Sequence, residues 1–469
     1  MILEVIHIKT IKIITLGCKT NFYESSAMAG LLRNAGYAIT ENDIADIYII
    51  NTCTVTNTGA SKSRQAIKKC KQANPTSIVA VTGCLAQLDA DEIAKIDGVD
   101  VVSGVERGNI VELIRDFDVG STMLEVVQKT QSSVGEALKA PFNKGDAKER
   151  GIALPDTYEE ISAVDTQSRV RAVVKIQDGC DNYCSYCIIP YARGRARSRK
   201  LENIIAEAKA LAKTFSEIVI TGINLTSYGK DLAENIGLID VLERLNEIDG
   251  IERIRLGSLS PTIVDKAFAE RVARLDKLCP QFHLSLQSGC DETLKMMNRK
   301  YDTTQYLQAV RLLCENVSDC AITTDLIVGF PGESEEQFEQ SYEFCKQIGF
   351  SQMHIFKYSK RAGTVAAEMK EQVLKADKQR RSERMLELAV NMKREFYQNY
   401  VGEIVDVLFE SRKAHETSNH GELGRWHGLT TNYMDVLAQS NADLEGKIKR
   451  VKLTAVDFDG ENLVGEIIE

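Results

Sequence analysis

The chain has 469 residues, enough for about three domains. Hydrophobic residues make up 43% and charged residues 27%, which excludes a largely disordered or fibrous protein. The formal net charge of −9 has the wrong sign for bulk electrostatic coating of nucleic acid, so any RNA binding must use local patches. No apolar run approaches the ~18 residues that cross a bilayer, and the first residues lack a signal-peptide pattern, so we expect a cytoplasmic protein with no membrane partner.

The first part of the chain alternates short apolar runs with helix-length amphipathic stretches. Strands are predicted at 11–16, 46–50 and 78–81, and helices at 23–36, 59–72 and 89–96. This alternation predicts βα units around a parallel sheet, in an N-terminal domain at residues 1–130. Polar, irregular sequence then predicts a linker at residues 131–165.

A second alternation begins at Ala172 and predicts a partial (β/α)6 barrel over residues 166–398. Its apolar runs lie near 172–176, 218–220, 254–256, 282–286, 322–328 and 353–356, and a helix at 378–398 closes it. Shorter alternating runs follow at 404–409, 429–436, 448–453 and 463–468. They predict a small antiparallel β-barrel over residues 399–469, so the expected fold class is α/β with this barrel appended.

Three of the twelve cysteines lie close together in the sequence. Cys180, Cys184 and Cys187 follow the first predicted barrel strand, where one loop can wrap them around one metal centre. A structural zinc site takes four ligands, and no fourth Cys or His lies nearby in the sequence. A 4Fe–4S cluster bound by three thiolates leaves one iron open for an exogenous ligand, which favours a cluster over a zinc site or an incidental group of thiols.

A second group of three cysteines is dispersed over the N-terminal domain. Cys18, Cys53 and Cys84 each follow a predicted strand, and about one βαβ unit separates each from the next. All three should therefore emerge at the carboxyl edge of one sheet and can converge on one centre. The alternative is three unrelated buried thiols, since free cysteine is often buried.

Two such sites in this order, beginning with Gly17-Cys-Lys-Thr-Asn21, resemble the methylthiotransferase family of radical S-adenosylmethionine enzymes. Further matching motifs are Pro190-Tyr-Ala-Arg-Gly-Arg-Ala-Arg-Ser-Arg199, Leu286-Gln-Ser-Gly-Cys-Asp291, Asp325-Leu-Ile-Val-Gly-Phe-Pro-Gly-Glu333 and Tyr358-Ser-Lys-Arg-Ala-Gly-Thr364. The resemblance implies a radical S-adenosylmethionine barrel, a terminal TRAM barrel that binds RNA, and two 4Fe–4S clusters, each held by one group of three cysteines.

The resemblance also implies a reaction and its partners. S-adenosylmethionine bound at the cluster of Cys180, Cys184 and Cys187 is cleaved to a radical, and a methylthio group reaches carbon 2 of a modified adenosine in tRNA. The implied partners are tRNA, an electron donor such as a flavodoxin or ferredoxin, and a sulfur donor. A rival from another class is a non-catalytic, metal-bound RNA-binding protein.

Lys19 carries much of the substrate prediction. The Gly-Cys-Lys-x-Asn pattern resembles the branch of the family that acts on threonylcarbamoyladenosine at position 37, next to the anticodon. The branch acting on isopentenyladenosine usually has Gly-Cys-Gln-Met-Asn, and the branch acting on a ribosomal protein has Gly-Cys-x-Lys-Asn. Both remain alternative substrates.

Residues just after the predicted barrel strands are candidates for holding S-adenosylmethionine, because βα barrels build their active sites on that face. The candidates are Thr221, Gly222, Gln287 and Gly329. Ordinary turn formation is the alternative role of these residues. The basic run from Arg193 to Lys200 could receive phosphates at the entrance of the site, or it could simply be solvated.

The remaining cysteines share no spacing, and we expect them to be packing residues. They are Cys70, Cys279, Cys290, Cys314, Cys320 and Cys345. From residue 401 onward the chain has 13 acidic and 7 basic residues, a formal charge of −6. RNA binding there would need stacking, for which Trp426, His427 and Tyr433 are the expected aromatic faces.

Overall fold

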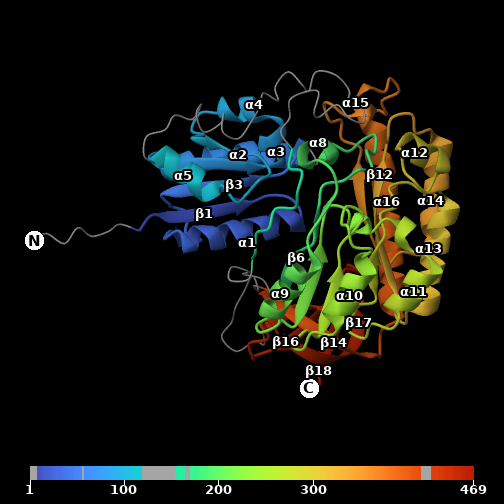
Figure 1. The fold of residues 1–469 in the computed structure, drawn as a ribbon. Coiled ribbons are helices and arrows are strands. Elements are labelled where there is room, and N and C mark those ends of the chain that lie inside the picture. Colours follow the sequence, from blue (N-terminus) through green and yellow to red (C-terminus); the bar gives the residue numbers. More distant parts are fainter. Residues whose placement is uncertain (1–7, 55–56, 119–153, 164–169, 414–423, 469) are drawn as a thin grey trace, which may run out of the picture. The chain divides into compact units, whose positions relative to one another are not determined.

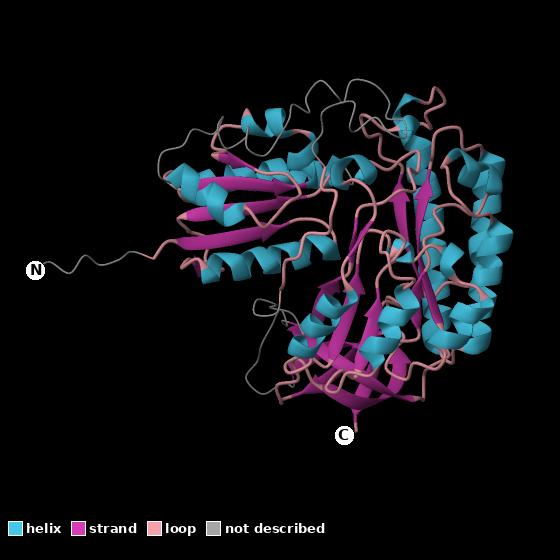
Figure 2. Cartoon of the chain, in the orientation of Figure 1, coloured by secondary structure: helices cyan, strands magenta, loops and turns pink. Residues whose placement is uncertain are grey.

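The structure, a computed structural model, describes residues 8–54, 57–118, 154–163, 170–413 and 424–468. The chain divides into two compact units, whose helices and strands are shown in Figures 1 and 2. The first unit comprises Met1–Gln167, Lys175–Lys200 and Ser359–Glu368, and the second comprises Ser168–Val174, Leu201–Tyr358 and Met369–Glu469. Residues 131–153 of the expected linker lie outside the described residues. No helix within the described ranges is long and apolar enough to cross a membrane.

The first unit is built on a parallel sheet with the strand order β2-β1-β3-β4-β5. Its elements are β1 (Thr10–Thr15), α1 (Lys19–Asn34), β2 (Ala38–Ile39), β3 (Ile47–Thr52), α2 (Asn57–Ala73), β4 (Ile78–Gly83), α3 (Cys84–Leu88), α4 (Ala90–Ala94), β5 (Val101–Val102), α5 (Ile110–Asp118), β7 (Gln177–Asp178), α8 (Ile189–Arg193), β8 (Arg197–Ser198) and α15 (Val365–Glu368). Because a strand is pleated, Tyr48 packs with Ile67 of α2 on one face, while Ile49 packs with Met28 of α1 on the other. Figure 1 shows α1 and α2 on these opposite faces. The predicted parallel α/β domain is confirmed.

The second unit contains six barrel strands in two sheets, ordered β10-β9-β6 and β11-β12-β13. Its α/β elements are β6 (Ala172–Lys175), α9 (Leu201–Leu211), β9 (Glu217–Thr221), η2 (Leu225–Ser227), α10 (Leu238–Asn246), β10 (Arg253–Leu256), η3 (Pro261–Ile263), α11 (Lys266–Val272), β11 (Gln281–His283), α12 (Asp291–Met296), α13 (Thr303–Asn316), β12 (Ala321–Val328), α14 (Glu335–Ile348), β13 (Gln352–Lys357) and α16 (Lys375–Gln398). A parallel bridge between Leu259 and Leu284 connects the two sheets. The predicted partial (β/α)6 barrel is therefore confirmed.

The chain ends in a closed barrel with the strand order β14-β15-β16-β18-β17. Its strands are β14 (Ile404–Lys413), β15 (Gly424–Thr430), β16 (Asp435–Ser440), β17 (Ile448–Val456) and β18 (Leu463–Ile467), and only the described pair β16 and β18 is parallel. The predicted small barrel is confirmed, but the single run at 429–436 is two strands. Tyr433 has φ 73°, and the hydroxyl of Thr430 accepts a hydrogen bond of 2.9 Å from the backbone N–H of Met434. This polar turn divides the run, so its apolar ends belong to different strands.

The three aromatic residues of the terminal barrel that were predicted to stack on RNA all make contacts within the protein. Trp426 is 6% exposed and lies in the core of the barrel, so the prediction that its ring stacks on RNA bases is wrong. Nε2 of His427 lies 3.0 Å from a carboxylate oxygen of Asp435. The guanidinium of Arg255 lies 4.7 Å from the ring centroid of Tyr433. Stacking by Trp426 is thus excluded, whereas His427 and Tyr433 are half-buried and Phe458 of the same barrel is 97% exposed.

A buried ion-pair network joins the terminal barrel to the (β/α)6 barrel. Glu217 at the start of β9 lies 2.8 Å from Nε of Arg255, and both side chains are at most 1% exposed. Arg255 also donates to the carbonyl oxygens of Thr430 and Thr431, while Arg253 donates to two further carbonyl oxygens of the terminal barrel. Although burial alone would raise the pKa of Glu217, Arg255 holds that pKa below its usual value. The two barrels of this unit are thus connected by buried charge.

Replacing Arg255 with methionine should destabilise this connection. Glu217 would lose its hydrogen-bonded partner in a buried position, and such losses cost about 3–5 kcal/mol. The unfolding of the terminal barrel in urea can be followed by fluorescence, because Trp426 is the only tryptophan of the chain. The matched control is Arg244→Met, which breaks an exposed i,i+3 pair with Glu247 and should leave the midpoint unchanged. Equal midpoints for the two variants would contradict the expected role of Arg255.

The remaining cysteines divide into two groups. Four of them are buried as expected, namely Cys70, Cys279, Cys290 and Cys345. The packing prediction is wrong for Cys314, which is exposed, and incomplete for Cys320, which is half-buried. A hydrogen bond between these two thiols lowers the pKa of Cys314 and raises that of Cys320. They lie next to one another at the connection from α13 to β12.

Candidate functional site

The three dispersed cysteines lie at the same edge of the parallel sheet in the first unit. Cys18 is the N-cap residue of α1, Cys53 directly follows β3, and Cys84 is the first residue of α3 after β4. Because β3 lies between β1 and β4 and all three strands are parallel, these cysteines share the carboxyl edge. The structure therefore places them where the sequence predicts, and their role as metal ligands stays a prediction.

Two glycines allow these loops to approach closely. Gly17 has φ +110°, and a Cβ atom there would lie 2.9 Å from Cβ and 3.1 Å from Sγ of Cys53. Gly83 has φ +106°, and a Cβ atom there would lie 2.5 Å from the carbonyl oxygen of Thr52. Larger residues would push the loops apart. The side chain of Asn21 fixes the approach, since Nδ2 donates to the carbonyl oxygens of Leu16 and Thr52 at 2.8 and 3.0 Å.

The other three cysteines lie on the loop between β7 and α8 of the same unit, and all three are half-buried. The backbone N–H of Cys180 donates to the carbonyl oxygen of Gly194 at 3.0 Å, and that of Cys187 donates to Cys184 at 2.9 Å. These bonds return the loop on itself. The ring of Tyr183 packs edge-on against Tyr191, with centroids 5.6 Å apart. The loop thus presents three thiols within a fixed backbone.

A single buried side chain, Arg193, connects the two cysteine loops. It is the last residue of α8, and its Nε donates to Sγ of Cys84 at 3.2 Å. Its other N–H groups donate to Glu24 at 2.7 and 3.0 Å, to Asp178 at 3.0 Å and to Asn21 at 3.0 Å. Every N–H of this guanidinium has an acceptor, which is what complete burial requires.

The surrounding charges have a positive excess. Four buried cations surround two buried carboxylates, with a sum of +4 − 2 = +2, and each side chain is at most 8% exposed. The cations are Arg107, Lys175, Arg193 and Arg197, and the anions are Glu24 and Asp178. Although burial alone would raise the pKa of Glu24, the three nearest cations hold it well below its usual range. The uncompensated positive charge next to Cys84 suits an anionic, thiolate-ligated centre.

The thiols themselves also fit such centres. Burial raises the pKa of the Cys84 thiol, and the charge of Arg193 opposes this by favouring the thiolate. Burial lowers the pKa of Arg361, on the segment before α15, and the nearby charge of Cys53 opposes this. The chain forms no disulfide among its described cysteines, and Cys18 is exposed. The binding of a 4Fe–4S cluster by each group of three thiols stays a prediction.

The basic run after α8 is not a continuous phosphate-binding surface. Arg193, Arg197 and Arg199 are each at most 4% exposed. Arg193 and Arg197 pair with Asp178, and Arg199 pairs with Glu160. Only Arg195 and Lys200 of the run are exposed. The prediction of an entrance lined by the whole run is therefore wrong for its three buried arginines.

The predicted cosubstrate residues lie in the second unit, at carboxyl ends of barrel strands. Thr221 ends β9, with Gly222 next in the chain, and Gly329 directly follows β12 with φ +69°. Gln287 has φ 72°, and its backbone N–H donates to the carbonyl oxygen of Asp325 at 2.9 Å. Their positions suit a site on the face that βα barrels use. Their contact with S-adenosylmethionine stays a prediction.

Sequence reasoning missed the buried acids that organise the first unit. Glu24 accepts hydrogen bonds from Arg107 and Lys175, which are 83 and 151 residues away, whereas Asp178 accepts one from Lys175, three residues before it. Glu24 lies in the apolar-faced helix α1, where a carboxylate is conspicuous, and Asp178 lies two residues before Cys180. These positions in the sequence are the signals by which the two acids could have been identified as functional candidates. Their partners could not be identified without the fold.

The chain is similar to known families and proteins along nearly its whole length. The radical SAM superfamily matches residues 174–345, and the uncharacterized protein family UPF0004 matches residues 10–104. Threonylcarbamoyladenosine tRNA methylthiotransferase MtaB of Bacillus subtilis is 37% identical to this chain, and the match covers 96% of this chain and 94% of the relative. The enzyme of the same name from Aquifex aeolicus is also 37% identical, and the match covers 93% of this chain and 98% of the relative. The tRNA-2-methylthio-N(6)-dimethylallyladenosine synthase of Thermoanaerobacter pseudethanolicus is 36% identical, covering 97% and 92%.

A solved structure shares the fold. It is the radical S-adenosylmethionine methyltransferase TsrM from Kitasatospora setae, with cobalamin and a [4Fe-4S] cluster bound. The TM-score is 0.56 at 14% sequence identity, with 77% of each chain covered. At this identity the likeness concerns the architecture alone.

Proposed function

Because this chain belongs to the family of radical S-adenosylmethionine methylthiotransferases, we propose that it converts threonylcarbamoyladenosine at position 37 of tRNA to its 2-methylthio derivative. The chain is a transferase that uses S-adenosylmethionine and two 4Fe–4S clusters. The observation that carries the reaction is the pair of three-thiol loops in one compact unit, connected by the buried guanidinium of Arg193.

The two loops have different roles in this proposal. When bound, the cluster at Cys180, Cys184 and Cys187 supplies the electron that cleaves S-adenosylmethionine, and the cluster at the dispersed cysteines holds the sulfur to be transferred. Arg193 stabilises the Cys84 thiolate by a charge-assisted hydrogen bond of 3.2 Å. Gln287 and Gly329 would hold the cosubstrate at the carboxyl ends of the strands. The cycle needs an electron donor, such as a flavodoxin or ferredoxin, and a sulfur donor.

The proposal divides this work among three parts of the chain. Residues 1–130 provide the dispersed cysteines, and residues 166–398 provide the cluster loop and the (β/α)6 barrel. Residues 399–469 form the terminal barrel, which would bind the tRNA. That binding would use exposed polar and basic side chains of the barrel together with Phe458, which is 97% exposed.

The choice of substrate depends mainly on Lys19. Relatives named for the two modified adenosines are 37% and 36% identical to this chain, so overall identity does not separate them. Lys19 is exposed and directly follows Cys18 at the edge where the sulfur-holding centre is proposed. A side chain at that position can contact the group attached to the adenine. The Gly-Cys-Lys pattern therefore supports threonylcarbamoyladenosine.

Mass spectrometry of tRNA nucleosides tests this assignment. Cells that lack the protein should lose 2-methylthio-threonylcarbamoyladenosine, accumulate its unmodified precursor, and keep their 2-methylthio-isopentenyladenosine unchanged. The full chain expressed from a plasmid should restore the missing nucleoside, whereas the Cys18→Ala variant should not. If the isopentenyl nucleoside were lost instead, the chain would be assigned to the other substrate. If the levels of both methylthiolated nucleosides were unchanged, the role of the chain in tRNA modification would be overturned.

A further inference from the structure

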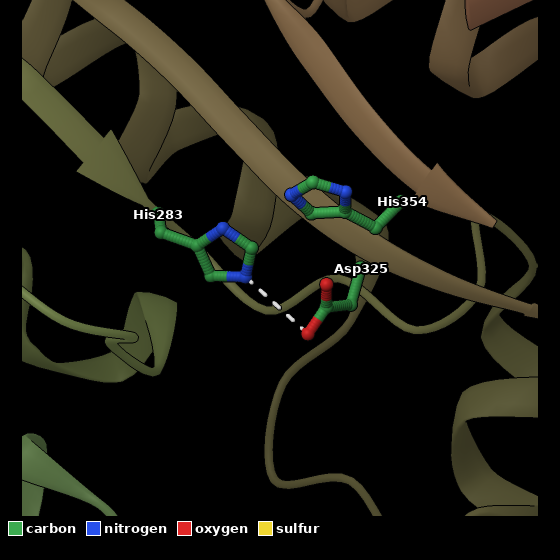
Figure 3. Close-up of side chains that lie close together, drawn as sticks. All are labelled: His283, Asp325 and His354. Atoms are coloured by element: carbon green, nitrogen blue, oxygen red, sulfur yellow. Dashed lines mark ion pairs between the residues drawn. The ribbon is translucent and has the colours of Figure 1, made fainter. Parts of the chain in front are cut away.

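Three side chains that no step above uses meet on one sheet of the second unit. His283 ends β11, Asp325 lies within β12, and His354 lies within β13. Asp325 and His354 are direct partners in the parallel register, while His283 pairs with Thr323, two residues before Asp325 on the same face. Figure 3 shows the three side chains converging from these adjacent strands. The register therefore fixes two imidazoles and one carboxylate together.

The distances between their donor atoms are those of a metal site. Nε2 of His283 lies 3.4 Å from Oδ2 of Asp325, and one donor atom from each of the three residues lies within 4.8 Å of the others. Two ligands about 2.1 Å from one ion are about 3.0–3.4 Å apart in octahedral or tetrahedral geometry. Nε2 of His283 and Oδ2 of Asp325 already have this spacing. The His354 ring stacks on that of His283, with centroids 6.1 Å apart, and its exposed side chain would have to move closer to complete the site.

The hydrogen bonding of His283 leaves the right atom for a ligand role. Its Nδ1 lies 3.1 Å from Oγ1 of Thr323, and that hydroxyl also accepts a hydrogen bond of 2.8 Å from Nε2 of Gln281. Among the described residues, Nε2 of His283 is buried and has no hydrogen-bond partner. In the tautomer of His283 that donates Nδ1–H to Thr323, Nε2 is left to bind a metal, which is the usual arrangement at metal sites.

We propose that His283, Asp325 and His354 bind a divalent transition-metal ion, at a site that uses none of the six cluster cysteines. Two imidazoles and one carboxylate suit Zn²⁺, Fe²⁺, Co²⁺ or Ni²⁺, whereas Mg²⁺ and Ca²⁺ prefer oxygen ligands alone. An ion here would neutralise the charge of Asp325 and cross-link β11, β12 and β13. The carbonyl oxygen of Asp325 accepts the N–H of Gln287, so the ion would also fix the strained backbone beside the proposed cosubstrate site.

Zinc binding by the cluster-loaded enzyme tests the proposal. The wild-type chain and three variants are equilibrated anaerobically with Zn²⁺, desalted, and analysed for zinc, iron and sulfide. His354→Ala removes an exposed ligand and Asp325→Asn is isosteric, so both should fold. The matched control is His427→Ala, which removes the histidine of the other His–Asp pair, in the terminal barrel. Iron and sulfide report whether the clusters remain intact in every sample.

We expect the wild type and His427→Ala to retain one zinc ion per chain. His354→Ala and Asp325→Asn should lack this ion. The iron and sulfide contents should be the same in all four proteins. This readout does not involve catalysis, so it stands apart from the test of the proposed function. Equal zinc in the wild type and His354→Ala would overturn the site, because the metal would then be bound elsewhere. Absence of retained zinc from the wild type would overturn it as well.

Discussion

Replacing Cys180, Cys184 and Cys187 together with alanine should abolish reductive cleavage of S-adenosylmethionine. The iron content should fall from about eight to about four atoms per chain, because one of the two clusters loses all its protein ligands. Chromatographic measurement of 5′-deoxyadenosine under reducing conditions checks the activity. The matched control replaces Cys314 and Cys320, which lie together outside the cluster loops, and should keep both iron and cleavage. Persistent 5′-deoxyadenosine in the triple variant would refute the assignment of this loop.

The complementary replacement of Cys18, Cys53 and Cys84 separates the two centres. Because the thiols at the sheet edge are different from those on the loop after β7, cleavage of S-adenosylmethionine should remain measurable. Methylthiolated tRNA should not form, and about four iron atoms per chain, those of the other cluster, should be lost. A normal yield of product from this variant would show that the sheet edge does not handle the transferred sulfur.

The positions of these six cysteines could be predicted from the sequence because the signals are local. An apolar run predicts a strand, and a cysteine directly after it must lie at the carboxyl edge of a parallel sheet. The same reasoning placed Thr221 and Gly329 at strand ends. Here a residue's position depends only on the element next to it.

The sequence could not predict partners that are distant along the chain. Arg193 looked like part of a basic run that receives phosphates or is solvated, yet its charge is matched by Glu24, 169 residues away. Trp426 looked like a stacking platform, but closure of the terminal barrel buries it. His283 and His354 looked like ordinary strand residues, since only the register of three strands brings them together. In each case the deciding information is tertiary.

The buried ion network should make Glu24 one of the residues most important for the stability of the first unit. Glu24→Gln removes one of two carboxylates that face four cations, all buried. The variant leaves excess positive charge away from water, and loss of a buried partner costs about 3–5 kcal/mol. Urea unfolding of the cluster-loaded protein, followed by the visible absorbance of the clusters, measures the change. Fluorescence of Trp426 in the second unit provides an internal reference that should shift far less.

The pH dependence of this effect follows from the direction of the pKa shift. The cations hold the pKa of Glu24 well below its usual range, so its stabilisation is fully present above the unfolded pKa of about 4.3 and is lost only as the pH falls toward the folded pKa. The difference between wild type and Glu24→Gln should therefore be constant from pH 6 to pH 8, and it should shrink in acid below about pH 4. The control Glu92→Gln breaks an exposed pair with Lys95 and should give no measurable change. If Glu24→Gln unfolded at the same urea concentration as this control, Asp178 and the thiolates would suffice to neutralise the buried cations, and Glu24 would contribute nothing to the stability of the site.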